Sequence, residues 1–203
     1  MQNKVLILDF GSQYTQLIAR RIRELNIYCE IFPFNKIPEI TPEYVGVILS
    51  GSPFSVHDKD SPEINFETFG NLPVLGICYG AQLIAKENDC VVAKSEIREY
   101  GRAKLSYVNS ESVLMKDVEL DSDVWMSHGD SITEITESFQ VLASTKDVKV
   151  TSYYFKQKNY YGLQFHPEVT HTAFGREILN NFTVKICGCS QSWNPKRFVE
   201  YTI

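Results

Sequence analysis

The sequence predicts an α/β fold: one doubly wound, mostly parallel open sheet with helices on both faces and appended antiparallel strands. Short apolar runs alternate with helix-like segments over the first half of the chain, which is the pattern of parallel βαβ units. The runs VGVIL at 45–49 and PVLGI at 73–77 carry no charge, as is typical of strands buried on both faces. From about residue 91 to residue 165, β-type runs follow one another and predict the antiparallel part.

The first half of the chain divides clearly into strands, helices and loops. Lys4–Asp9 predicts the first strand, and a helix starts after Gly11-Ser12, because positions 14, 17, 18, 22 and 25 are apolar at helical spacing. Ile27–Phe32 predicts a second strand, and prolines at 33, 38 and 42 predict a loop. The polar segment 58–63 indicates a loop with a short helix. The strand ending at Ile77 leads directly into a helix at Tyr79–Glu87.

The second half is expected to be mainly β, with one helix near its end. The expected strands are Lys104–Val108, Val124–Met126, Gln140–Ser144, Val148–Phe155 and Tyr160–Phe165. The charged stretch Glu96–Arg102 is expected to be a solvated loop, and Ala173–Ile186 the last helix. Cys187–Pro195 is expected to stop this helix and run on as an exposed tail. We therefore expect a domain at residues 1–188 and the start of a linker at residues 189–203.

Composition and charge exclude several classes of protein. The chain has 203 residues, of which 43% are hydrophobic, so there is enough apolar material for a core and disorder is excluded. The formal net charge is −5 and no run of Lys and Arg reaches five, which argues against a nucleic-acid partner. The longest nearly uncharged stretch, Val74–Ala85, is too short to span a membrane. Five cysteines without a framework spacing fit a reducing compartment, so we expect a cytoplasmic protein.

The segment Gly76-Ile77-Cys78-Tyr79-Gly80 has the spacing of a nucleophile placed between a buried strand and a helix. Such a turn is very tight, and flanking glycines let neighbouring backbone segments approach closely. The N-terminus of the following helix favours negative charge, and therefore a thiolate. A lone cysteine is more commonly a packed core residue, so the catalytic interpretation requires a base elsewhere in the chain.

The candidate base lies in Gln164-Phe165-His166-Pro167-Glu168. In extended chain, residues two apart point the same way, so Glu168 can lie beside His166 and orient its ring. Together with Cys78 they make a nucleophile, a general acid/base and an anchor for the imidazole. Because each half-motif follows a predicted strand, we expect Cys78, His166 and Glu168 to form one catalytic triad.

An acyl-transfer site also needs donors for the oxyanion. Ser50-Gly51-Ser52-Pro53 follows the buried strand at 45–49, so its backbone should lie at the same sheet edge as Cys78. The backbone N–H of Tyr79, at the start of a helix, is the second natural donor. A plain turn would use the same residue types at 50–53.

These segments together resemble the class I, or triad, glutamine amidotransferases, which have a flavodoxin-like fold. The resemblance covers nearly the whole chain, from Lys4 to about Phe182. The segments Asp9–Tyr14 (DFGSQY), Trp125–Asp130 (WMSHGD) and Gln164–Thr172 (QFHPEVTHT) narrow it to the glutaminase domains of GMP synthases.

The resemblance implies glutamine as the substrate and a role for each site residue. Cys78 would attack the side-chain amide, His166 would carry the proton and Glu168 would hold His166. The positions that match the family's head-group binding residues are Gln82, Ser127, His128, Gly129 and Asp130. The positions that match its backbone oxyanion donors are Ser52 and Tyr79. Ser52 departs from the family's usual Ser-Gly-Gly-Pro pattern, so its assignment depends on the φ and ψ angles it can adopt.

The resemblance also implies a partner. This would be an ATP pyrophosphatase domain or subunit that uses ATP and magnesium to adenylate xanthosine monophosphate and accepts the ammonia. The chain contains neither a Ser-Gly-Gly-Val-Asp-Ser loop nor a G-x-x-x-x-G-K-[ST] motif, so ATP and magnesium are expected outside it and no cofactor within it. Cys187, Cys189 and His171 fit no standard zinc spacing. We expect an excised domain of a longer protein, whose missing part would carry any homodimer contact.

Three alternatives remain at this stage. The chain could supply ammonia to another biosynthetic synthase, such as one that makes anthranilate or carbamoyl phosphate. It could be a glutamine-sensing docking module, although such a module has no need to keep both Cys78 and His166. It could also be a cysteine hydrolase of γ-glutamyl or peptide bonds, which has no need of the segment Trp125–Asp130. Substrate assays separate all three.

Overall fold

A twisted sheet organises the molecule. The computed structural model describes residues 3–194 except the side chains of residues 95–99, and within that range the sheet has nine strands in the order β2-β1-β3-β4-β9-β8-β7-β5-β6. The parallel half consists of β1 (Lys4–Asp9), β2 (Tyr28–Pro33), β3 (Tyr44–Leu49), β4 (Val74–Ile77) and β9 (Tyr160–Leu163). The antiparallel half continues from β9 through β8 (Ser152–Phe155), β7 (Phe139–Thr145), β5 (Val91–Val108) and β6 (Asp123–Glu134). The predicted parallel sheet with appended antiparallel strands is confirmed.

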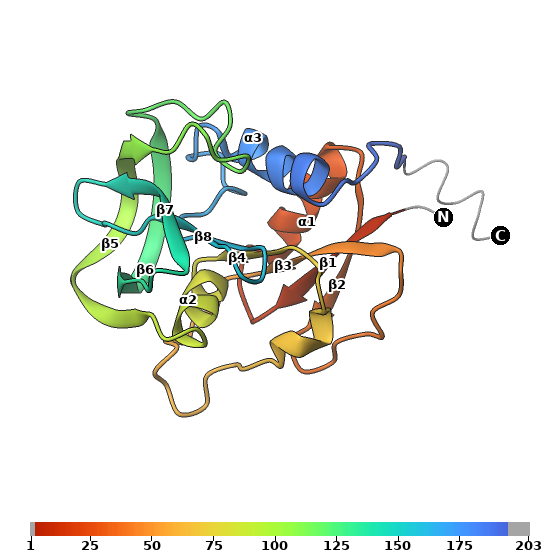
Figure 1. The fold of residues 1–203 in the computed structure, drawn as a ribbon, viewed down its shortest axis with the longest axis horizontal. Helices are drawn as coiled ribbons and strands as arrows, with labels where there is room; N and C mark the ends of the chain where they lie inside the picture. The colour runs from red at the N-terminus through yellow and green to blue at the C-terminus, as the bar shows by residue number, and fades with distance from the viewer. Residues whose placement is uncertain (1–2, 195–203) are drawn as a thin grey trace.

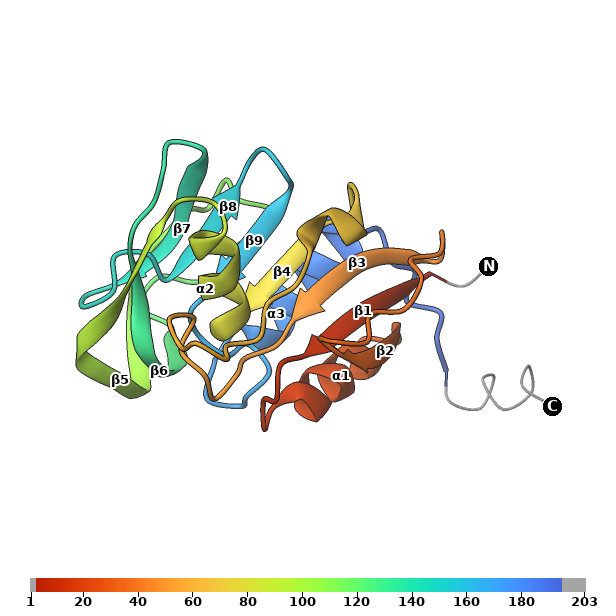
Figure 2. The ribbon, with the colours of Figure 1, turned by 90° about the horizontal axis from the view of Figure 1, so that it is seen from below.

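Helices cover both faces of the sheet, as predicted. Figure 1 shows α1 (Thr15–Glu24) and α3 (Gly175–Asn180) together on one side, and α2 (Tyr79–Lys86) on the other. A π-helical turn at Asn181–Ile186 continues α3, so the single helix expected at 173–186 is a composite of two helix types. The short helix expected in the loop after β3 is a 3₁₀ turn at Phe66–Phe69. Figure 2 shows the same layers from below.

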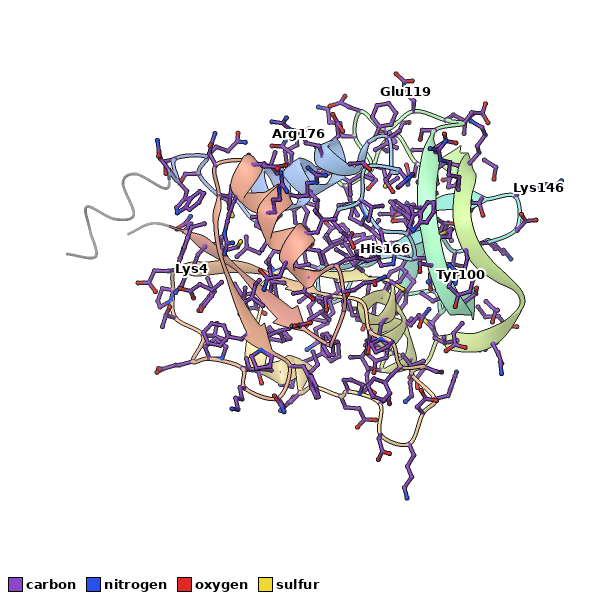
Figure 3. The ribbon with its side chains drawn as sticks, turned by 180° about the vertical axis from the view of Figure 1, so that it is seen from behind. Lys4, Tyr100, Glu119, Lys146, His166 and Arg176 are labelled. Atoms are coloured by element: carbon purple, nitrogen blue, oxygen red, sulfur yellow. The ribbon has the colours of Figure 1, made fainter. Side chains whose placement is uncertain are left out.

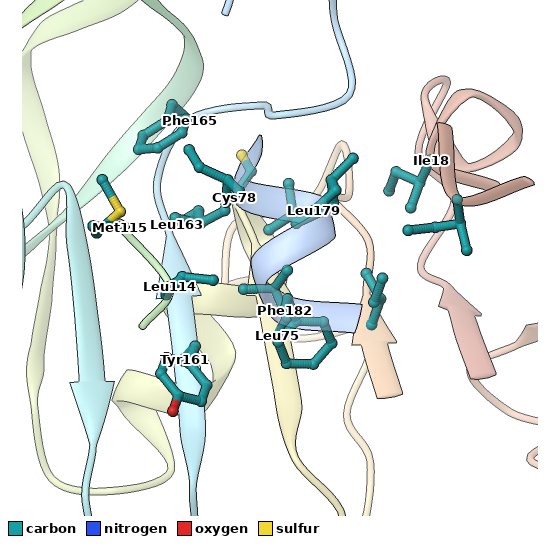
Figure 4. Close-up of a cluster of buried hydrophobic side chains, with 14 of the residues drawn as sticks. Ile18, Leu75, Cys78, Leu114, Met115, Tyr161, Leu163, Phe165, Leu179 and Phe182 are labelled. Atoms are coloured by element: carbon teal, nitrogen blue, oxygen red, sulfur yellow. The ribbon is translucent and has the colours of Figure 1, made fainter. Parts of the chain in front are cut away.

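Alternation along β1 explains why two cores form. Val5 and Ile7 point to the core shared with α1 and α3, and Leu6 and Leu8 point to the core under α2, as the period of two in a strand requires. All four side chains are fully buried. Figure 4 shows the first core, where Cys78 lies close to Leu163, Phe165 and Leu179. The nucleophile candidate is therefore held at the border between the core and the surface.

The antiparallel half corrects two expectations. Glu96–Arg102 is not a loop, because the backbone of this stretch belongs to β5, which pairs with β6 with a register shift between Lys94 and Glu99. Pairing along the partner strand overrides the polar composition of the stretch. Val148–Phe155 is a strand only from Ser152, since the backbone of Val148 closes a turn with Thr145 and the hydroxyl of Thr151 bonds both residues.

The segment after the last helix is also different from the expected exposed tail. Cys189 is buried, the backbone N–H of Trp193 donates to the carbonyl of Asn26 at 2.8 Å, and the side chain of Gln191 donates to the carbonyl of Leu25 at 3.0 Å. These contacts fasten the described part of the segment to the end of α1. The β-type run at 198–203, expected to belong to a linker, lies outside the described residues.

The strand order determines where a site can form. The order β2-β1-β3-β4-β9 reverses between β1 and β3, and in open α/β sheets ligands bind at the carboxyl ends of the strands beside such a switch point. The segments that follow β1, β3, β4 and β9 all start at this edge. Among residues 3–194, no helix is long and apolar enough to cross a membrane.

Gly76 lies where α2 packs closely against β4. A Cβ on Gly76 would lie 2.5 Å from the backbone of both Gly80 and Ala81, so α2 would have to move away from β4. We expect Gly76→Ala to lower the free energy of unfolding by about 3 kcal/mol, measured by urea denaturation. Gly129→Ala is the control, because a Cβ there meets nothing within 4 Å. Equal losses for the two variants would contradict a packing constraint at Gly76.

Candidate active site

Cys78 sits on a strained turn between β4 and α2. Its φ of +53° and ψ of −106° lie in a region that residues with a side chain rarely adopt. The turn is imposed from both sides: the N–H of Cys78 donates to the carbonyl of Leu163 at 2.7 Å, and the N–H of Gly80 donates to the carbonyl of Ser50 at 3.2 Å. Sγ is directed towards β6, 3.6 Å from the carbonyl oxygen of Ser127. The sequence-predicted nucleophile elbow is present.

His166 and Glu168 follow β9 and face the same turn. Nδ1 of His166 lies 2.7 Å from Oε1 of Glu168, and the Glu168 side chain is completely buried. The imidazole also interacts with the thiol of Cys78, and this interaction contributes to its pKa shift. Gly51 lies beside both groups, since a Cβ at that position would be in ordinary van der Waals contact with the imidazole Cε1 at 3.6 Å and with Cβ of Cys78 at 3.8 Å. The structure therefore brings the three predicted triad residues together, with His166 hydrogen-bonded to Glu168 and close to Cys78.

The electrostatics of this line favour a protonated imidazole. Burial opposes the charged form of His166, but the hydrogen bonds with Cys78 and Glu168 outweigh burial and raise the pKa of His166 from 6.5 to about 10. The nearby His128 behaves in the opposite way, because its burial lowers its pKa to about 4. At neutral pH the site thus holds one protonated and one neutral imidazole. The charge is placed beside Cys78, and His128 does not add a second one.

The sequence-predicted binding residues line the same cleft as the nucleophile. The cleft has a volume of about 540 Å³, and of the predicted residues it is lined by Ser52, Cys78, Tyr79, Gln82, Ser127, His128, Gly129, Asp130 and His166. Glu168 lies behind His166 instead of in the wall. The side-chain amide of Gln82 donates to the carbonyl of Asp130 at 2.8 Å, so α2 and β6 are joined across the cleft.

The predicted oxyanion donors, Ser52 and Tyr79, border the same cleft as Cys78. Tyr79 is the first residue of α2, so its N–H has no partner inside the helix. Ser50 anchors the opposing loop, because its hydroxyl accepts from the N–H of Phe10 at 3.0 Å and donates to the carbonyl of Gly51. Both Ser52 and Tyr79 line the cleft.

The loop after β1 belongs to the site, which the sequence analysis did not assign. Gly11, Ser12, Gln13 and Tyr14 line the cleft. The ring of Tyr14 packs edge-on against the imidazole of His166, with the centroids 5.1 Å apart. Asp9 fixes the loop, since its carboxylate accepts from the N–H of Gly11 at 2.9 Å and from the Thr15 hydroxyl at 2.7 Å. The position of this loop at the strand-order switch was the available signal.

The rim of the cleft adds exposed side chains from distant segments. Phe54 is 44% exposed and Tyr100 is 64% exposed, and both line the cleft together with Lys94. Figure 3 shows Tyr100 on the β5 side of the site, with His166 nearer the middle of the molecule. Among the described residues, no group of three or more His, Cys, Asp and Glu side chains is placed to hold a metal ion. The chemistry that this arrangement can perform is acyl transfer through a cysteine.

Comparison with known proteins agrees with this geometry. The family model for glutamine amidotransferase class-I matches residues 6–186, and the chain belongs to that family. The GMP synthase of Cytophaga hutchinsonii is 57% identical over 100% of this chain, and that of Phocaeicola vulgatus is 52% identical over the same span. This chain spans about 40% of the length of these two relatives.

Solved structures give the same fold. The crystal structure of a putative GMP synthase subunit from Thermoplasma acidophilum matches with a TM-score of 0.76 and 29% identity, covering 99% of this chain and 98% of that one. A glutamine amidotransferase from Thermotoga maritima matches with a TM-score of 0.68 and 18% identity, covering 94% of this chain and 87% of that one. At that identity, the second match supports the fold alone.

The raised pKa of His166 can be measured. Because the folded-state value of about 10 lies above 6.5, protonation of His166 stabilises the fold fully below about pH 6.5, and this contribution is lost as the pH rises through 10. Cys78→Ala removes the thiol beside the ring, and Glu168→Gln removes the negative charge that faces Nδ1, so both should lower the pKa of His166. NMR titration of the His166 ring measures the effect. An unchanged pKa in both variants would contradict this account of the site.

Proposed function

We propose that this chain hydrolyses the side-chain amide of glutamine and supplies the ammonia for the conversion of xanthosine monophosphate to GMP. The observation that carries the proposal is the grouping of Cys78 and His166 at one wall of a cleft of about 540 Å³, with Glu168 hydrogen-bonded to His166 from behind. Membership of the class-I glutamine amidotransferase family supports glutamine as the substrate. The similarity to two GMP synthases at 57% and 52% identity supports the destination of the ammonia.

The first half of the reaction forms a thioester. The thiolate of Cys78 attacks the amide carbon, and the backbone amides of Ser52 and Tyr79 stabilise the negative charge on the carbonyl oxygen. His166 then gives its proton to the departing nitrogen, so that the C–N bond breaks and ammonia leaves. The raised pKa of His166 suits this role, because the imidazole starts the reaction with the proton that the leaving group needs.

The second half of the reaction releases glutamate. His166, now neutral, takes a proton from a water molecule that attacks the thioester, and the C–S bond breaks to return the thiolate of Cys78. Glu168 holds the ring through Nδ1 at 2.7 Å, which leaves the other ring nitrogen for this proton transfer. The complete cycle consumes one glutamine and one water and gives one glutamate and one ammonia.

The remaining steps are assigned to a partner that this chain does not contain. The relatives are longer, and this chain spans about 40% of them. In the proposal, a further domain or subunit uses ATP and magnesium to adenylate xanthosine monophosphate, and the adenylated carbon accepts the ammonia. Confinement of the ammonia between the two sites would prevent its protonation and loss to water.

A cytoplasmic location follows from the same proposal, because a GMP synthase reaction uses nucleotides and ATP. In this proposal the chain needs no bound metal or cofactor of its own. The thiol, the imidazole and the backbone amides supply every group that the hydrolysis requires.

Substitution of the triad tests glutamine hydrolysis. Cys78→Ala and His166→Ala should abolish glutamate release, since each removes a group that takes part in bond breaking, whereas Glu168→Gln should leave a measurable remnant. Coupled glutamate detection gives the rate, and the thermal unfolding of each variant controls for folding. A Cys78→Ala variant that still releases glutamate would overturn the proposed nucleophile.

Labelling with diazo-oxo-norleucine tests the pocket independently of turnover. One adduct per chain should map to Cys78, and excess glutamine should suppress it. The other four cysteines, of which Cys29, Cys90 and Cys189 are buried, serve as internal controls in the same digest. An adduct spread over several cysteines would contradict a dedicated glutamine pocket at Cys78.

A reconstitution experiment tests the destination of the ammonia. The chain is combined with an ATP pyrophosphatase domain from a GMP synthase, glutamine, ATP, magnesium and xanthosine monophosphate, and GMP is measured. Glutamine-dependent GMP formation should require intact Cys78, while added ammonium salts should bypass Cys78→Ala. If the chain releases glutamate but the added domain neither speeds this release nor forms GMP, another synthase would be favoured as the partner.

A further inference from the structure

A threonine hydroxyl is inserted in the backbone pairing that holds His166 in place. Phe165 forms an antiparallel bridge with Met126 of β6, so the next opposing pair is His166 and Trp125. In an antiparallel ladder such a pair exchanges two N–H···O=C bonds. One of them is present, because the N–H of His166 donates to the carbonyl of Trp125 at 3.0 Å.

The second bond of this pair runs through Thr172. The N–H of Trp125 donates to Oγ1 of Thr172 at 3.1 Å, and the same hydroxyl donates to the carbonyl of His166 at 2.6 Å. The hydroxyl oxygen of Thr172 therefore bridges the N–H of Trp125 and the carbonyl of His166, which would bond each other directly in a regular ladder. The two hydrogen bonds of this bridge fix the distance between the backbone of His166 and β6.

Thr172 is itself held by its surroundings. It is 5% exposed, its N–H donates to the carbonyl of Val169 at 3.2 Å, and the next N–H, of Ala173, donates to the carbonyl of Asp123 at 2.9 Å. The loop from His166 to Ala173 is thus fastened to β6 on both sides of the hydroxyl. Because the Thr172 side chain is held in this way, it keeps the two backbone groups that it bridges at a fixed distance.

The distance matters because β6 also carries the other side of the reacting centre. Ser127, two residues beyond Trp125 on β6, faces the thiol of Cys78 with its carbonyl oxygen 3.6 Å from Sγ. The segment that continues to Asp130 lines the cleft. The strand that presents the substrate wall is therefore the strand against which Thr172 sets the position of the imidazole.

We infer that Thr172 is a positioning residue, whose hydroxyl bridge between Trp125 and His166 sets the imidazole in line with Cys78. The inference rests on the proposed glutamine hydrolysis and adds a residue outside the cleft wall to that site. Thr172 touches neither the substrate nor the reacting atoms. It acts through the backbone of His166, and a misplaced imidazole slows proton transfer more than it weakens substrate binding.

The test compares three variants of the full 203-residue chain. Thr172→Val keeps the shape and removes the hydroxyl, and Thr172→Ser keeps the hydroxyl. Thr151→Val is the matched control, because Thr151 is also buried and its hydroxyl likewise accepts from a backbone N–H (Thr145, 3.1 Å) and donates to a carbonyl (Val148, 3.0 Å). Each variant is assayed for glutamate release, for thermal unfolding and for the pKa of His166 by NMR.

We expect Thr172→Val to lower kcat on the order of tenfold or more, with KM within about twofold, and to move the pKa of His166 towards its ordinary value. Thr172→Ser should restore both to near the wild-type values. Thr151→Val should lose stability, since it removes the two hydrogen bonds of a buried hydroxyl, while kcat and the pKa of His166 stay unchanged.

The outcomes separate this inference from the proposed function. An active wild-type chain with unchanged kcat and pKa in Thr172→Val would overturn the positioning role alone. An equal fall of kcat in Thr151→Val, or a failure of Thr172→Ser to restore kcat, would also overturn it, because the effect would then be general destabilisation. A wild-type chain that neither releases glutamate nor reacts with diazo-oxo-norleucine at Cys78 would overturn the proposed function, and the inference with it.

Discussion

The close approach of α2 to the ends of β3 and β4 is the constraint on which the site depends. A Cβ on Gly80 would lie 2.6 Å from the Leu49 side chain, and one on Gly76 would lie 2.5 Å from the backbone of α2. With the helix so near, the chain can pass from β4 into α2 only through a left-handed residue, and that residue is Cys78. Such a conformation costs on the order of 1–2 kcal/mol for a residue with a side chain, and the surrounding hydrogen bonds hold it.

The strained turn has two chemical consequences. It directs the thiol towards β6, and it places the thiol at the N-terminus of α2, where the helix dipole favours negative charge. The same edge of the sheet receives His166 from β9, and burial there would normally favour a neutral imidazole. The interactions with Cys78 and Glu168 outweigh burial and raise the pKa of His166, so the imidazole beside Cys78 is protonated at neutral pH.

How far the sequence predicts the structure depends on the range of the interactions. The parallel strands and the elbow follow from local patterns, because apolar runs and glycine spacing report directly on burial and close approach. The stretch at Glu96–Arg102 was expected to be a loop because its composition is polar, yet its backbone is part of β5. A polar stretch can join a two-stranded ribbon when its partner strand supplies the hydrogen bonds, and that partner lies some thirty residues further along the chain. Cys189 was expected to lie in an exposed tail because the residues that bury it are far away in the sequence, where local composition does not reveal them.

The sequence alone determined which chemical groups are present and in what local order. Cys78 between two glycines, His166 two residues before Glu168, and the segments from Asp9 and from Trp125 were enough to indicate the family and its triad. Only the tertiary structure decided how these groups meet. Tyr14 contacts His166 edge-on, Ser50 anchors the loop that follows β3, and the hydroxyl of Thr172 lies between Trp125 and His166. These contacts join segments that are far apart in the sequence. A single sequence carries no record of such distances, because they are fixed by the register and order of strands in the folded sheet.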